Sequence, residues 1–153
     1  MSRFPTGRWG RRKLVFHPAP ARAPFRPFAA LAFIWHQGKV LICDIPGRGW
    51  CIPSGRVEAL ETSAEAARRE AFEEGGAHID NVRYIGCYQI FSNNSEVWAE
   101  AYTASLASLV EIPEGSESKG RKFENVENLP ASYHIWDELT EAIFGYARSV
   151  FER

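Results

Sequence analysis

Residues 55–77 read GRVEALETSAEAARREAFEEGGA. This stretch follows the pattern G-x5-E-x7-R-E-U-x-E-E-x-G-U, in which U is an aliphatic residue and x is any residue. Its fixed positions are Gly55, Glu61, Arg69, Glu70, Glu73, Glu74 and Gly76, and Ala71 and Ala77 stand at the aliphatic positions. The pattern joins a glycine turn to a carboxylate-rich helix, so it predicts both a local shape and a chemistry.

The centre of the 55–77 motif is predicted to be a helix over residues 62–75. Thr62 precedes the helix and Glu65 follows three positions later, which is the spacing of a capping box. Repeated alanines give high helix propensity and a small-residue face that suits close packing on a sheet. Gly75-Gly76 supplies the left-handed stop expected at the end of a helix.

Three carboxylates of this helix are expected to converge. Residues three and four positions apart share a helix face, with Cβ atoms about 5–6 Å apart, so Glu70, Glu73 and Glu74 should lie together. Hard oxygen ligands of this kind suit Mg²⁺ or Mn²⁺, and Mg²⁺ leaves coordination positions for water and phosphate. The helix alone would also allow a solvated face with Arg69 paired to acids at i±4.

The 55–77 motif resembles the Nudix box, and the chain is similar to MutT-like members of the Nudix hydrolase family. This resemblance implies an α/β (α+β) fold, an α/β/α sandwich with a central mixed β-sheet. It also implies attack of water on a phosphorus of a nucleoside diphosphate derivative, with Mg²⁺ or Mn²⁺ as cofactor. The implied metal ligands are Glu70, Glu73, Glu74 and the backbone carbonyl of Gly55, with Glu70 implied as either ligand or base. The implied stabilising pair is Glu61 with Arg69.

A general base is expected outside the motif, because several family members carry an extra glutamate on a loop. Glu117 in the polar loop PEGSESKG is the candidate, ahead of Glu114; a solvated surface acid is the alternative. Glu96, Glu100 and Glu127 are the weaker candidates. The candidate substrate contacts are Arg48 and Lys119 for phosphate and Trp50 for stacking, although aromatic residues at strand spacing are usually core.

The expected substrate is a nucleoside triphosphate, including oxidised forms, cleaved to a monophosphate and pyrophosphate. Positions 92–94 are Ser-Asn-Asn and lack the proline and tyrosine of subgroups with other substrates, which favours the MutT-like branch. Two alternatives stay open. One is removal of pyrophosphate from RNA 5′ ends, and the other is a sensing domain that binds a nucleotide without cleaving it.

The composition predicts one domain with an unusual start. Residues 1–43 contain eight Arg or Lys and no acid, although the net charge of the whole chain is −1. We expect residues 1–27 to form a basic Pro/Arg-rich arm that is not a separate domain, and residues 28–153 to form the single domain. The arm either steers a polyphosphate or RNA, or is simply solvated and partly mobile.

No membrane partner is expected, because the longest apolar run, Phe28–Trp35, is too short to span a bilayer. Cys43, Cys51 and Cys87 form no disulfide framework, and the chain has no secretory signal, so a cytoplasmic location is expected. The sequence leaves monomer and homodimer open.

The remaining chain is predicted to alternate strands and helices. Lys13–Phe16 is expected to be at most a short strand, followed by an extended connector, so that regular order begins at Phe28. Two hairpins, further strands and a terminal helix follow. Their predicted ranges are 28–36 with 39–45, 50–53, 79–91 with 96–107, 121–126 and 136–151.

Overall fold

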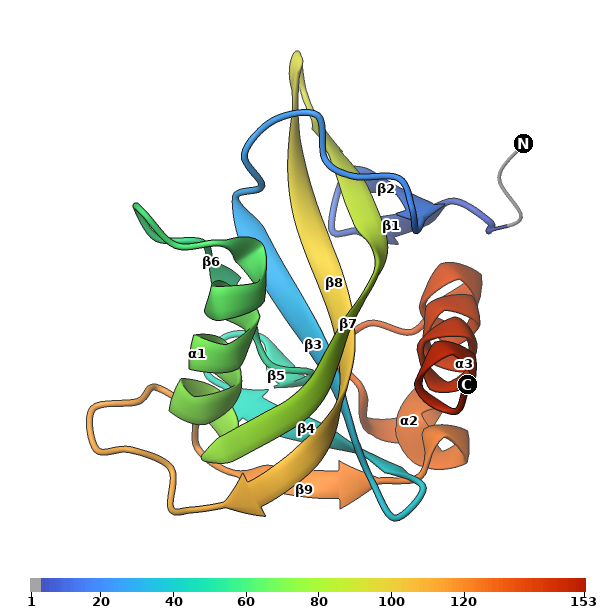
Figure 1. The fold of residues 1–153 in the computed structure, drawn as a ribbon. Coiled ribbons are helices and arrows are strands. Elements are labelled where there is room, and N and C mark those ends of the chain that lie inside the picture. The colour runs from blue at the N-terminus through green and yellow to red at the C-terminus, as the bar shows by residue number, and fades with distance from the viewer. Residues whose placement is uncertain (1–3) are drawn as a thin grey trace.

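The computed structural model describes residues 4–153 and shows a mixed sheet between helices (Figure 1). The strands of this part of the chain are β1 (Gly7–Trp9), β2 (Arg12–Pro18), β3 (Ala29–His36), β4 (Lys39–Ile45), β5 (Gly49–Cys51), β6 (Ser54–Arg56), β7 (Ala77–Ser92), β8 (Ser95–Leu109) and β9 (Arg121–Glu124). The helices are α1 (Ser63–Gly75), the short 3-10 turn η1 (Val126–Asn128), α2 (Leu129–Ser132) and α3 (Glu138–Phe151).

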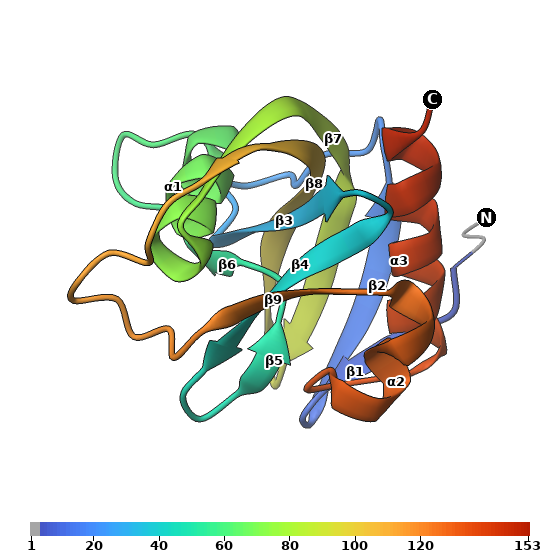
Figure 2. The same cartoon turned by 90° about the horizontal axis from the view of Figure 1, so that it is seen from below.

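The strand order confirms the predicted mixed α/β architecture. Neighbours in the sheet run β1-β2-β7-β8-β3-β4-β5, while β6 pairs with β3 and β9 pairs with β4. β3 and β8 are parallel, and the other pairs are antiparallel. Figure 2 shows α1 on one face of this curved sheet and α2 with α3 on the other.

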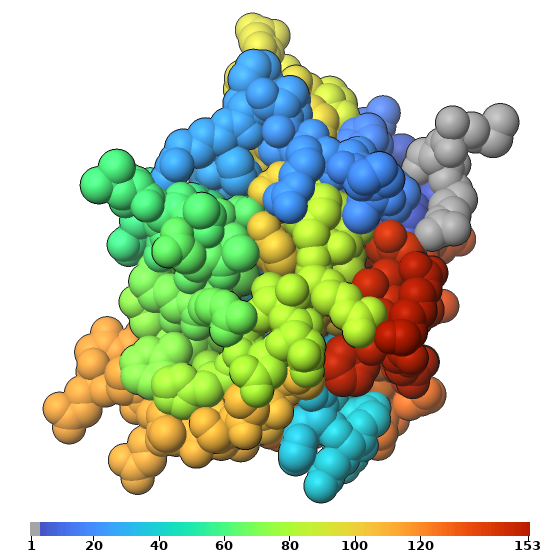
Figure 3. All heavy atoms as spheres, viewed as in Figure 1, coloured from blue at the N-terminus to red at the C-terminus, as the bar shows by residue number. Residues whose placement is uncertain are grey.

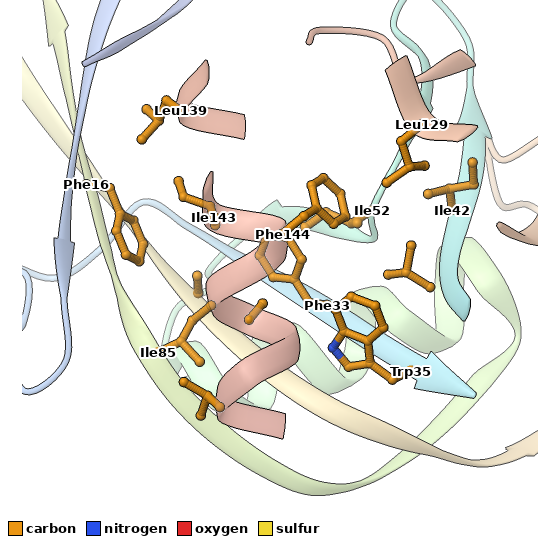
Figure 4. Close-up of a cluster of buried hydrophobic side chains, with 14 residues drawn as sticks. Phe16, Phe33, Trp35, Ile42, Ile52, Ile85, Leu129, Leu139, Ile143 and Phe144 are labelled. Carbon is orange, nitrogen blue, oxygen red and sulfur yellow. The ribbon is translucent and has the colours of Figure 1, made fainter. Parts of the chain in front are cut away.

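The two faces have different cores. Under α3 the core is built from large side chains, with Phe33 and Phe144 meeting edge to face at 4.9 Å between ring centroids (Figure 4). Under α1 it is built from small ones, and Ala66, Ala67 and Ala71 of the helix are buried against the sheet. Small side chains let a helix approach a sheet closely, so the predicted alanine face is confirmed and holds α1 near β3 and β6.

Both predicted hairpins are present. β3 and β4 join through Gln37-Gly38, whose φ angles of 51° and 78° are those of a tight turn that favours glycine. β7 and β8 pair along most of their length and close at Ser92 and Ser95. Both strands of this second hairpin are longer than predicted, and register shifts along the pair let it curve across the sheet.

The expectation that regular order begins at Phe28 is wrong for the described part of the N-terminal segment. Residues 7–18 form β1 and β2, and β2 pairs with β7 from Lys13↔Phe91 to Pro18↔Gly86. Phe16 is fully buried in the α3 core, which the proline-rich context concealed. Regular order therefore begins before Phe28, and residues 19–28 form a connecting segment without strand or helix between β2 and β3.

Three further elements differ from the prediction. The strand predicted at 50–53 is shorter than expected, because β5 ends at Cys51. A separate strand, β6, begins at Ser54, where the sequence predicted the turn around Gly55. η1 and α2 were not predicted because each is too short to show a period. Within residues 4–153, each helix falls short of the length and apolar character needed to cross a bilayer.

Candidate active site

The 55–77 motif folds as its sequence predicts. Thr62 Oγ1 accepts the Glu65 backbone N–H at 3.1 Å, and the Glu65 carboxylate accepts the Thr62 backbone N–H at 2.8 Å. This is the predicted capping box. Gly76 ends α1 with φ 60°, and its N–H bonds back to the carbonyls of Ala71 and Phe72. The two ends of α1 are therefore fixed by residues of the motif.

Arg69 is the centre of the predicted ion pair. Its Nε and Nη2 donate to the two oxygens of Glu61 at 2.8 and 3.0 Å, and Nη2 also donates to the carbonyl of Arg56 at 2.8 Å. This bidentate contact lowers the pKa of Glu61. Nη1 donates to Glu70 at 2.7 Å and to Glu73 at 3.1 Å. One guanidinium thus ties the loop before α1 to two of the helix carboxylates.

Glu70 and Glu74 point from α1 toward β6. Glu74 is 5% exposed and accepts the backbone N–H of Ser54 at 3.1 Å. A Cβ placed on Gly55 would overlap the Glu70 carboxylate, so only glycine allows that carboxylate to lie on the strand. Burial raises the pKa of Glu70, and burial also raises the pKa of Glu74 to about 8. Both carboxylates are partly withdrawn from water, and burial of this kind makes their charged forms costly.

Glu73 is more exposed than these two. Its side chain is 46% exposed and accepts from Arg69 Nη1, which it shares with Glu70. Within residues 4–153 no three His, Cys, Asp or Glu side chains are grouped closely enough to hold a metal ion. The predicted convergence of the three glutamates is therefore not seen, because Arg69 Nη1 lies between Glu70 and Glu73.

The donor set nevertheless fits a divalent cation. Glu74 is buried and forms no ion pair within the described residues, and it lies beside Glu70, whose charge contributes to the raised pKa of Glu74. Two hard oxygen donors that repel each other at the backbone of Gly55 are suited to Mg²⁺ or Mn²⁺. Glu70, Glu74 and the Gly55 carbonyl are the groups that would hold it, with Glu73 at the edge.

The loop that carries Glu117 lies beside α1 (Figure 2). Its end is fixed on β4, where Lys119 N–H donates to the Asp44 carbonyl at 2.8 Å and Asp44 N–H donates to the Gly120 carbonyl at 2.9 Å. Glu117 is exposed, and its charge contributes to the raised pKa of Glu74. The structure therefore brings Glu117 toward the buried carboxylates. The Lys119 side chain is exposed and forms no hydrogen bond or ion pair with the described residues.

Arg48 and Trp50 lie in different settings. Arg48 donates to the hydroxyl of Ser54 at 3.3 Å, which places a cation beside the start of β6. The ring of Trp50 lies under the ammonium of Lys122 at 4.5 Å, and Trp50 is not among the residues that line the cleft described next. Arg48 therefore lies near Glu70 and Glu74, whereas the Trp50 ring is not placed with them.

A cleft of about 320 Å³ opens on the α3 face of the sheet and ends at Ser54 and Gly55. β6 therefore has the helix carboxylates on one side and this cleft on the other. Arg8 and Trp9 of β1 line part of the cleft, because Arg8 N–H donates to the Asp137 carboxylate at the start of α3. The other residues that line it include Leu14, Leu31, Phe33, Arg48, Ile52, Arg56, Tyr88, Ile90, Tyr133, His134, Ile135, Thr140 and Phe144.

Sequence reasoning missed this cleft. Its residues come from strands β1, β2, β3, β5, β6, β7 and β8, from α3 and from loops between the elements, so no spacing along the chain relates them. The aromatic rings alone could have given a signal, but rings at strand spacing are usually core. His134 also belongs to the cleft, and burial, followed by the charge of Arg48, lowers its pKa to about 4.

The connecting segment also makes contacts beside the site, and these particular contacts were not predicted from the sequence. Arg26 donates to the backbone carbonyls of Glu58 and Glu61 in the loop before α1. Arg22 pairs with the buried Glu100 at 3.2 Å, and Glu100 also accepts from Ser63 at the start of α1 at 2.7 Å. Figure 3 shows this blue segment against the green residues of the loop and first helical turn.

Comparisons with known proteins agree with this geometry. The NUDIX domain family model matches residues 25–142. The chain is 34% identical over 83 residues to the putative 8-oxo-dGTP diphosphatase YtkD of Bacillus subtilis strain 168, a match that covers 54% of this chain and 52% of that protein. It is 38% identical over 69 residues to the phosphatase NudJ of Escherichia coli K12, covering 42% and 45%. The chain thus spans about half the length of the curated relatives it matches.

Solved structures show the same fold. The pyrophosphohydrolase BsRppH of Bacillus subtilis superposes with a TM-score of 0.75 at 23% identity, covering 94% of this chain and 92% of that one. A MutT NUDIX hydrolase from Burkholderia pseudomallei superposes with a TM-score of 0.58 at 19% identity, covering 80% and 95%. Because the family model matches most of the chain and the 55–77 motif has the expected local structure, the chain belongs to the Nudix family.

Proposed function

We propose that this chain is a metal-dependent pyrophosphohydrolase that cleaves a nucleoside triphosphate to a monophosphate and pyrophosphate. One observation carries the proposal. β6 separates a pair of buried carboxylates, Glu70 and Glu74, from an apolar cleft that ends at Gly55. A diphosphate at Gly55 would have metal-binding oxygens on one side and room for its organic group on the other.

The residues have separate tasks in this reaction. Glu70, Glu74 and Glu73 would hold the divalent cation together with the Gly55 carbonyl, and Arg69 would keep the loop before α1 fixed to the helix. When bound, the cation would supply positive charge for the phosphates and acidify water. Arg48, beside Ser54, stabilises negative charge on the phosphate that faces the cleft.

Glu117 is the proposed general base. A carboxylate on a loop that faces Glu74 can accept the proton of a water molecule as that water attacks phosphorus. The bridging P–O bond then breaks, and pyrophosphate leaves from the nucleoside monophosphate. The Lys119 side chain, on the same loop, is the proposed contact for the leaving phosphates.

Turnover of a nucleotide panel tests the proposal. Purified protein with Mg²⁺ or Mn²⁺ should release pyrophosphate from nucleoside triphosphates, with 8-oxo-dGTP included because YtkD is named a putative 8-oxo-dGTP diphosphatase. Reaction in ¹⁸O-labelled water would locate the attacked phosphorus. The double substitution E73Q/E74Q should abolish turnover, whereas the absence of metal-dependent hydrolysis from every nucleotide and RNA would favour a sensing domain.

A second substrate, the triphosphate at an RNA 5′ end, is favoured by a different observation. Arg8 and Trp9 line the cleft, and the basic residues continue along the hairpin to Arg11, Arg12 and Lys13, which are exposed. A basic strip with an aromatic ring suits a single strand that runs out of the cleft. Faster cleavage of a 5′-triphosphorylated oligonucleotide than of free nucleotide, lost on R11A/R12A substitution, would select this candidate.

A further inference from the structure

The polar chemistry of the cleft is unusual for a site that reads a nucleobase. Among the described residues that line it, none is Asp, Glu, Asn or Gln. These four side chains are the ones that accept hydrogen bonds from ring N–H and exocyclic amino groups with strong geometry. The lining is instead mostly aliphatic and aromatic, with arginines at its rim.

Several hydroxyl groups of the lining already have partners. The Tyr133 hydroxyl accepts the Ile52 N–H at 3.1 Å, and the Thr140 hydroxyl donates to Asp137 at 2.7 Å. The Ser54 hydroxyl accepts from Arg48. Each of these hydroxyls is oriented by its contact with the wall of the cleft, so what remains for a ligand is a leftover O–H or lone pair and not a fixed acceptor such as a carboxylate or amide oxygen.

The remaining polar side chains of the lining are biased toward donors. Arg8, Arg56, Tyr88 and His134 have side chains that form no hydrogen bond within residues 4–153. The two guanidinium groups can only donate. A base edge with N–H donors, such as the N1–H and N2 amino group of guanine, would leave those donors with few acceptors.

The size of the cleft points the same way. About 320 Å³ is at the small end of the range for ligand pockets, roughly 300–1,000 Å³, so it suits one ring system. Trp9 and Tyr88 line the cleft, and the Arg12 guanidinium lies over the Trp9 ring at 5.0 Å from its centroid, so a base that stacks on Trp9 meets the other face of the ring or displaces Arg12. Such stacking is open to any base, because every base has a π face. Apolar contacts distinguish ligands by about 10–200-fold per group, whereas a site that pairs buried polar groups distinguishes them by about 10⁴–10⁵-fold.

We propose that the cleft holds the organic group of the substrate by stacking and shape, without reading its hydrogen-bonding edge. The chain then hydrolyses nucleoside triphosphates of different bases at similar rates, and an 8-oxo group on guanine brings little advantage. This inference rests on the proposed function for its activity test. Its physical content is a binding property of the cleft.

Wild-type protein provides the first test. Values of kcat/KM for dATP, dGTP, dCTP, dTTP and 8-oxo-dGTP should fall within about tenfold of one another. The substitution W9L should raise KM about tenfold for every base alike, because it removes a ring that all bases share. The matched control F25L changes an exposed ring outside the cleft and should leave KM unchanged. A preference above about 100-fold for one base, or a W9L effect confined to one base, would overturn the inference.

Equilibrium binding separates this inference from the proposed function. Dissociation constants of the four deoxynucleoside monophosphates and 8-oxo-dGMP can be measured by titration calorimetry without turnover. Constants within about tenfold of one another support the inference even if no triphosphate is hydrolysed, in which case the proposed function alone fails. One monophosphate bound more than about 100-fold tighter than the others overturns the inference even if hydrolysis is fast.

Discussion

The carboxylate face of α1 and the cleft beneath α3 meet at β6 but are built in opposite ways. The first comes from one continuous stretch of chain, and its key contacts, such as Arg69 with Glu61, are local. The second is assembled from strands across the sheet and from α3. Chemistry that depends on one helix can be read from spacing, while a binding surface shared by many elements depends on how the chain folds.

The largest expected effect is a loss of kcat when the carboxylates of Glu74 and Glu73 are replaced, and the two losses should differ. Glu74 is buried against Ser54 and Glu73 is half exposed, so E74Q should lower kcat on the order of 10³-fold and E73Q about 10- to 100-fold. Steady-state kinetics with saturating Mg²⁺ would measure both. Equal losses would mean that Glu73 turns inward when the cation binds. That result would contradict the expectation that the exposed Glu73 contributes less than the buried Glu74.

The loop outside the motif should show the next largest effect. E117Q should lower kcat by about 10²- to 10³-fold with little change in KM, because a general base acts on the transition state. E114Q lies in the same loop and is exposed, so it serves as the matched control. Similar losses in both variants would point to loop structure rather than proton transfer.

A smaller effect is expected where the connecting segment holds the loop before α1. R26A removes the donor to the carbonyls of Glu58 and Glu61, so it should lower kcat about tenfold while substrate KM stays near wild type. R26K should restore part of the loss. R11A removes an exposed arginine of the β1–β2 turn as a control, and it should keep the wild-type kcat with nucleotides.

The smallest effect concerns pH on the cleft side. The pKa of His134 is lowered to about 4, so between about pH 6.5 and 4 the unfolded chain takes up a proton that the folded chain excludes. The contribution of His134 to stability should therefore fall by about 1 kcal/mol as pH drops through this window. Glu74 acts in the opposite direction, because its raised pKa of about 8 lets the folded chain keep a proton that the unfolded chain releases, so its contribution grows as pH drops from about 8 to 4.5. Thermal melts should therefore be compared between variants: H134Q should lose less stability than wild type between about pH 6.5 and 4, and H78Q, at an exposed site, should follow wild type. Equal pH profiles for H134Q and wild type would assign the loss to another group.

Sequence alone predicted the parts of the fold that have local periodicity. The capping box at Thr62, the glycine stop and both hairpins are confirmed, because each depends on neighbouring residues. β1 was not predicted, and β2 was expected to be at most a short strand at Lys13–Phe16, because Pro18 and Pro20 suggested an irregular connector. Pro18 is in fact the last residue of β2, a position where its missing N–H costs little.

The candidate site also contains residues that the sequence predicted and contacts that it could not predict. Residues of the 55–77 motif could be named in advance, and the Glu61–Arg69 pair is present as predicted. The outward direction of Glu73 could not be foreseen, since it depends on where Arg69 points. The hydrogen bonds of Arg26 to loop carbonyls could not be predicted, because every residue has a backbone carbonyl and the residue types do not show which one accepts.

The pairing of β2 with β7 has a consequence for synthesis. Lys13 leaves the ribosome long before its partner Phe91, so the N-terminal hairpin emerges with an unsatisfied strand edge and an apolar Phe16 that has nowhere to pack. Such edges invite pairing with other chains until the native partner arrives. The positive charges of Arg11, Arg12 and Lys13 oppose such pairing, because like charges on neighbouring nascent chains repel one another.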